Sequence, residues 1–169
     1  MKTKQLALCA VLTALALGLS YVENWFPLSL VIPLPGIKLG LANIVTVFAL
    51  YALGPAQAMA ILVCRCFLGS LFAGNLNAML FSMLGGVAAM AVMILLSRLP
   101  GLSIYGVSIG GAAAHNCGQV AAAILSLGNT APLYYLPILL GVSLLTGTLT
   151  GFISSLLFRA LGHTGLMRE

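Results

Sequence analysis

Charged residues are almost absent from this chain, and their scarcity constrains the fold more than any other feature. The 169 residues include seven Lys or Arg and two Asp or Glu, so that 5% of the chain is charged and 62% is hydrophobic. Soluble domains contain about 25% charged residues. We therefore expect an integral membrane protein, folded as a single domain over residues 1–169.

Six apolar segments fill most of the sequence. A helix needs about 20 apolar residues to cross a hydrocarbon core about 30 Å thick, and proline and glycine residues separate segments of about this length. The sequence predicts an all-α bundle of six transmembrane helices, at Gln5–Val22, Ile37–Leu53, Pro55–Phe72, Ala78–Ser97, Ile104–Leu127 and Leu133–Phe158. The first segment also resembles a signal peptide, but keeping it gives an even number of helices.

The basic residues predict the orientation of this bundle. If the N-terminus is cytoplasmic, Glu23 and Lys38 fall outside, and the basic positions at the termini and in the other connections fall inside, namely Lys2, Lys4, Arg98, Arg159, His163 and Arg168. This distribution agrees with the positive-inside rule. We expect a multi-pass protein of the cell membrane with both termini in the cytoplasm. The basic residues form no patch with interleaved aromatics, so a nucleic-acid partner is not expected.

Arg65 and His115 interrupt two apolar segments near their centres. A charge at mid-bilayer depth costs about 3 kcal/mol on insertion scales, so such a group usually faces the protein interior. Glu23 is expected near the outer surface, and the other acid is the terminal Glu169, so no buried carboxylate is expected to balance Arg65. Backbone carbonyls or an anionic ligand would then compensate its charge.

Further polar residues predict a cavity around these two. His115 and Gln119 are four residues apart, and Asn116 and Gln119 are three apart, so the three adjoin on one helix. Asn43 lies more than a turn into the second segment and needs an internal hydrogen-bond partner. Lys38 either extends to the outer surface or joins the cavity.

Several kinds of chemistry lack their usual residues. The chain has no Asp, no P-loop and no second ligand pair to accompany Cys64 and Cys66 in a zinc site. We therefore expect no catalytic residue, no metal and no cofactor. The proline-rich connection after Glu23, which includes Trp25, is either an interfacial stretch or a lid over an outward-opening site.

Small residues predict where helices approach closely. Ala10, Ala14 and Gly18 recur every four residues, a pattern that suits internal packing or docking to another subunit. Gly147 and Gly151 form a similar pair, for which we favour internal packing. Asn75 and Asn77 either cap helices or line the mouth of the cavity, and we favour capping.

Four strings of residues together resemble the family called heptaprenyl diphosphate synthase component I, also called the Gx transporter family. They are the segment Pro35-Gly36-Ile37-Lys38-Leu39-Gly40-Leu41-Ala42-Asn43, Arg65 with Leu68-Gly69, Gly85-Gly86, and Gly111-Ala112-x-x-His115-Asn116-x-Gly118-Gln119. The resemblance covers most of the chain. That family is similar in size and helix count to the substrate-binding S components of energy-coupling factor (ECF) importers.

The resemblance to S components implies roles for particular residues. A transmembrane coupling subunit with paired ATPases would dock on Ala10, Ala14 and Gly18, and Glu23 and Trp25 would belong to a lid. The residues expected to line the ligand cavity are Lys38, Asn43, Arg65, His115, Asn116 and Gln119.

Three functions remain open at the level of the sequence. The leading prediction is an importer subunit that binds a small anionic or amphipathic metabolite, such as an isoprenoid or quinone precursor. The second is a non-catalytic membrane partner of a prenyl diphosphate synthase, which matches the family name. The third is a stand-alone transporter or flippase.

Overall fold

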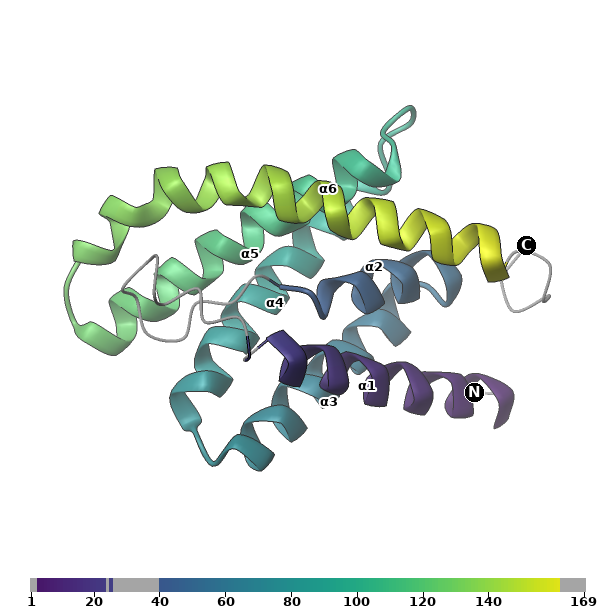
Figure 1. The fold of residues 1–169 in the computed structure, drawn as a ribbon, viewed down its shortest axis with the longest axis horizontal. Helices are drawn as coiled ribbons and strands as arrows, with labels where there is room; N and C mark the ends of the chain where they lie inside the picture. The colour runs from purple at the N-terminus through teal and green to yellow at the C-terminus, as the bar shows by residue number, and fades with distance from the viewer. Residues whose placement is uncertain (1–2, 24, 26–39, 162–169) are drawn as a thin grey trace.

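The computed structural model describes residues 3–23, 25 and 40–161 (Figure 1). This part of the chain is helical, with a short 3-10 helix, η2 (Ala131–Tyr135), before the last helix. The α-helices are α1 (Thr3–Glu23), α2 (Asn43–Ala52), α3 (Pro55–Ala73), α4 (Leu76–Leu96), α5 (Ile104–Leu127) and α6 (Leu136–Leu161). Lys38 and most of the connection that was expected to form a lid lie outside the described residues.

Helix ends follow the punctuation in the sequence. Pro55 opens α3, and Gly74, at a φ of 59°, ends it in the left-handed conformation that glycine adopts without strain. Asn75 then caps α4, because its side-chain oxygen accepts hydrogen bonds from the backbone N–H groups of Asn77 and Ala78. The predicted capping role is confirmed for Asn75.

The helix α2 departs from the prediction of a second transmembrane span. It covers 10 residues, which corresponds to about 15 Å, or half of the hydrocarbon core. Gly40 precedes it with a φ of 82°, a conformation that no helix continues through. All residues of α2 except Tyr51 are buried, so it is an internal element of the bundle.

Four stretches among the described residues are long and apolar enough to cross a membrane: Thr3–Glu23, Pro55–Ala73, Leu76–Leu96 and Ala131–Ala160. The helix α5 has 24 residues, but its glycines and polar side chains make it less apolar than these four. The prediction of six full spans is therefore confirmed only as an all-helical fold with four candidate spans.

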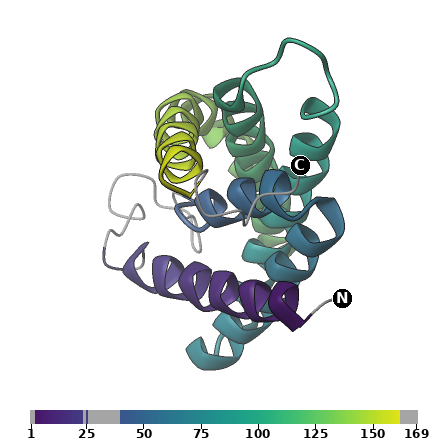
Figure 2. The ribbon, with the colours of Figure 1, turned by 90° about the vertical axis from the view of Figure 1, so that its right-hand side faces the viewer.

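The helices surround α2. The pairs α4–α5 and α5–α6 pack most extensively, whereas α1 packs on α3 and α2. Figures 1 and 2 both place α2 between α1 and α6. A Cβ atom built on Gly147 of α6 would lie 2.5 Å from the Cα of Ile109 in α5. Gly147 therefore allows close packing inside the bundle, as predicted.

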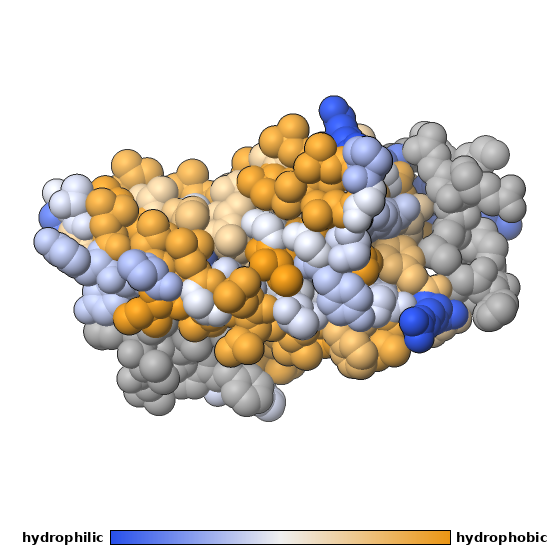
Figure 3. Space-filling view, turned by 90° about the horizontal axis from the view of Figure 1, so that it is seen from above, coloured by the Kyte–Doolittle hydropathy of each residue, from blue (hydrophilic) through white to orange (hydrophobic). Residues whose placement is uncertain are grey.

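The outer surface is apolar. Viewed from the side of α6, the space-filling surface is mostly hydrophobic, with hydrophilic groups in a few places (Figure 3). Leu145 is 75% exposed and Phe72 is 78% exposed. A continuous surface of this kind is typical of a protein surrounded by lipid. Together with the four spans, it is consistent with a membrane protein, whose orientation stays a prediction.

Candidate functional site

Arg65 forms the centre of the candidate site. It lies in the middle of α3 and is 7% exposed. Its Nη2 donates a hydrogen bond to Oδ1 of Asn43 at 3.3 Å, and its Nη1 donates to Oγ of Ser20 at 3.5 Å. Its Nε has no hydrogen-bond partner among the described residues. The guanidinium therefore joins α1, α2 and α3, and these two bonds use two of its five N–H donors.

Glu23 lies inside the bundle, which corrects the prediction that no buried carboxylate exists. It is the last residue of α1, is 4% exposed, and accepts a hydrogen bond from the backbone N–H of Gly40. Gly40 immediately precedes the turn into α2, where backbone N–H groups favour a negative group. Glu23 thus fixes the end of α1 to α2 instead of lying at the outer surface.

His115 and Gln119, both on α5, adjoin the residues around Arg65. A Cβ built on Gly40 would lie 3.6 Å from Cδ2 of His115 and 2.9 Å from Nδ2 of Asn43. A Cβ built on Gly85 would lie 2.9 Å from Cε1 of His115 and 3.1 Å from Cγ of Gln119. Gly40 and Gly85 therefore make room for the imidazole ring. The ring and Asn43, which accepts a hydrogen bond from Arg65, both lie next to Gly40.

Gln119 is fully buried, and neither atom of its side-chain amide has a hydrogen-bond partner in the described part of the chain. Asn116 differs, because its Nδ2 donates a 2.8 Å hydrogen bond to the carbonyl oxygen of Leu139. This bond connects α5 to α6, so the structure gives Asn116 a packing role. Its predicted contact with a ligand stays a prediction.

A cavity of about 400 Å³ opens beside Arg65, between α1, α3 and α4. The polar lining residues besides Arg65 are Ser20, Tyr21, Ser70 and Ser82, and the rest are small or apolar. Of the six residues predicted to line one cavity, Arg65 lines this one; Asn43, His115 and Gln119 lie behind it in the packed interior. The three serines were missed, because isolated serines in apolar helices carry no distinctive spacing.

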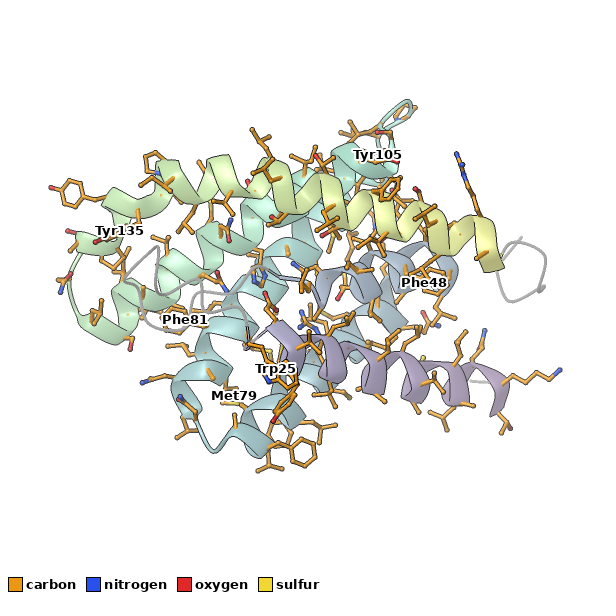
Figure 4. The ribbon with its side chains drawn as sticks, in the orientation of Figure 1. Trp25, Phe48, Met79, Phe81, Tyr105 and Tyr135 are labelled. Atoms are coloured by element: carbon orange, nitrogen blue, oxygen red, sulfur yellow. The ribbon has the colours of Figure 1, made fainter. Side chains whose placement is uncertain are left out.

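The residues predicted to form the lid and the docking face lie at different places on the molecule. Trp25 is 72% exposed and lies beside the end of α1, with its ring centroid 6.3 Å from that of Tyr21 (Figure 4). Ala10, Ala14 and Gly18 are exposed on α1. No other described part of the chain comes within 4 Å of a Cβ built on Gly18.

The described residues form an apolar helical bundle with four candidate membrane spans and a buried arginine beside a cavity, which is consistent with a helical membrane protein with a polar centre. The chain belongs to the family heptaprenyl diphosphate synthase component I, whose family model matches residues 12–157. The family resemblance drawn from the motifs is thereby confirmed. No curated protein and no solved structure matches the chain.

Proposed function

We propose that this chain is a non-catalytic membrane component that works with a prenyl diphosphate synthase and binds an anionic isoprenoid or quinone precursor. The family name supports the partnership, because it describes one component of a synthase. The observation that carries the binding role is Arg65, a buried cation that lines a cavity and uses two of its five N–H donors within the described part of the chain.

The composition supports placing the chemistry in the partner. Prenyl diphosphate synthases use clusters of aspartates to hold magnesium and diphosphate, and this chain contains no Asp. The carboxylate of Glu23 already accepts a hydrogen bond from the backbone of Gly40. The chain would therefore contribute a binding site and a membrane anchor, and the synthase would make the new bond.

The energetics of Arg65 favour an anion as the ligand. A guanidinium stays charged at any pH that a protein tolerates. A buried donor without a partner costs about 1–3 kcal/mol. A phosphate or carboxylate oxygen in the cavity would accept a charge-assisted hydrogen bond from the guanidinium, which is about twice as strong as a neutral one.

The partnership is tested by gentle purification of the full chain from its native membrane. We expect a soluble prenyl diphosphate synthase to co-purify, and deletion of the chain to lower the yield of long-chain prenyl product. Arg65→Gln should lower the yield while leaving the protein in the membrane. Arg98→Gln is the matched control, because Arg98 is exposed after the end of α4. A normal yield after deletion would contradict the proposal.

One observation favours a second candidate, the substrate-binding component of an ECF-type importer. Ala10, Ala14 and Gly18 are exposed along α1, where a transmembrane coupling subunit could approach closely. In that case the same purification would recover a coupling subunit with its ATPases, and Ala10→Leu combined with Ala14→Leu would release them. Recovery of a synthase alone would exclude this candidate.

A further inference from the structure

A second cavity adjoins the Arg65 cavity along the seam between α1 and α3. Its volume is about 740 Å³, and Leu17 lines both cavities. The α1 side includes Leu6 and Ala14, and the α3 side includes Ala60 and Cys64. We call this second cavity the α1–α3 groove. From Leu6 to Leu17 it follows α1 for about 16 Å, or three helical turns.

The α1–α3 groove is apolar, unlike the cavity that it joins. Thr13 and Gln57 are the polar residues in its lining, and the hydroxyl of Thr13 already donates to the carbonyl oxygen of Cys9 at 2.8 Å. Ala14, Ala60 and Cys64 are exposed, so the groove opens toward the surrounding lipid. An apolar chain could therefore enter it sideways from the bilayer.

We propose that the two cavities form one site for an anionic amphiphile with a single apolar chain. The anionic headgroup binds at Arg65, and the apolar chain lies in the α1–α3 groove. This inference rests on the anion-binding role proposed above and adds the location and nature of the tail. Charge complementarity selects this occupant: a helix of a partner protein would fill the groove without using the adjoining cation, whereas an anionic amphiphile uses both.

The inference predicts how filling the α1–α3 groove affects binding. Lipid tails are as apolar as the groove, so the tail gains affinity from close packing and not from escape from water. Filling the groove should therefore weaken binding of an amphiphile moderately, by about tenfold. It should leave binding of a headgroup alone unchanged, because Ala60 does not line the Arg65 cavity.

The test uses the full chain in phosphatidylcholine nanodiscs, with farnesyl diphosphate, inorganic pyrophosphate and farnesol as probes. We expect farnesyl diphosphate to bind more tightly than pyrophosphate, and farnesol to bind weakly. Ala60→Leu should weaken binding of farnesyl diphosphate but not of pyrophosphate. Arg65→Gln should abolish binding of both. Ala7→Leu is the matched control, since Ala7 is exposed on α1 and lines neither cavity.

Cysteine labelling gives a second measurement that needs no groove variant. Cys64 lines the groove, and Cys117 is exposed on α5 and lines neither cavity. Farnesyl diphosphate should slow the reaction of Cys64 with N-ethylmaleimide and leave Cys117 unchanged, whereas pyrophosphate should slow neither.

Three results would overturn the inference. One is equal affinity for pyrophosphate and farnesyl diphosphate, and another is Cys64 labelling that farnesyl diphosphate does not slow. The third is an Ala60→Leu protein that binds farnesyl diphosphate normally but loses a partner protein, which would make the groove a docking surface. None of these three results excludes binding of pyrophosphate that depends on Arg65. The anion-binding role is therefore tested separately, by whether Arg65→Gln abolishes pyrophosphate binding.

Discussion

At the scale of single residues, the structure explains how an arginine is held inside an apolar bundle. Arg65 donates to Asn43 and Ser20, and Glu23 is buried one helical turn beyond Ser20. Buried charges are tolerated when hydrogen bonds and opposite charges compensate them. Arg65 also lines a cavity, which is why we assign binding of an anion to this position.

Asn43 provides a direct test of this arrangement. Asn43→Ala removes the acceptor of the 3.3 Å bond from Arg65 and leaves a second buried donor unsatisfied. We expect the free energy of unfolding to fall by about 1–3 kcal/mol. Thermal unfolding in mild detergent measures the change. Asn77→Ala, at an exposed position, serves as the control. Equal unfolding temperatures for the two variants would show that the Arg65–Asn43 bond contributes little.

The sequence located the polar residues but not how they are arranged. Arg65 and His115 stood out because charge is rare in this chain, and the i, i+4 spacing identified Gln119. The buried position of Glu23 could not be predicted, because it depends on a hydrogen bond to Gly40, 17 residues away. The role of Gly85 likewise depends on contact between α4 and α5.

At the scale of elements, local signals predicted where helices end better than whether a helix spans the membrane. The bounds of α5 match the prediction, Ile104–Leu127, because Ser103 and Gly128 mark its two ends. The helix predicted at Ile37–Leu53 is observed as the shorter α2, Asn43–Ala52, so a second membrane span is not confirmed. Hydrophobicity alone does not distinguish a lipid-facing helix from one that is buried among other helices.

Close packing between α5 and α6 gives a test at this scale. Gly147→Ala would place a methyl group 2.5 Å from the backbone of Ile109, so the two helices must separate. We expect a loss of about 1–3 kcal/mol in stability, measured by thermal unfolding. Gly141→Ala is the matched control on α6, because no described atom outside the helix comes within 4 Å of its added Cβ. Similar stability of the two variants would contradict the observed packing.

At the scale of the whole molecule, the helices enclose a polar centre within an apolar exterior. The start of α1 and the end of α6 lie toward the same end of the molecule (Figure 1). This arrangement is consistent with the predicted orientation, in which Lys4 and Arg159 lie on the cytoplasmic side. The short α2 carries Asn43 to the centre, where Arg65 and the turn at Gly40 meet it.

The central claim is that Arg65 holds an anionic ligand inside the membrane. Native mass spectrometry of the gently purified protein tests it most directly, with Arg65→Gln and Arg98→Gln purified in parallel. We expect the wild-type protein and Arg98→Gln to retain a bound anionic molecule, and Arg65→Gln to lose it. A ligand retained equally by all three proteins, or a protein that is empty in every preparation, would contradict the claim.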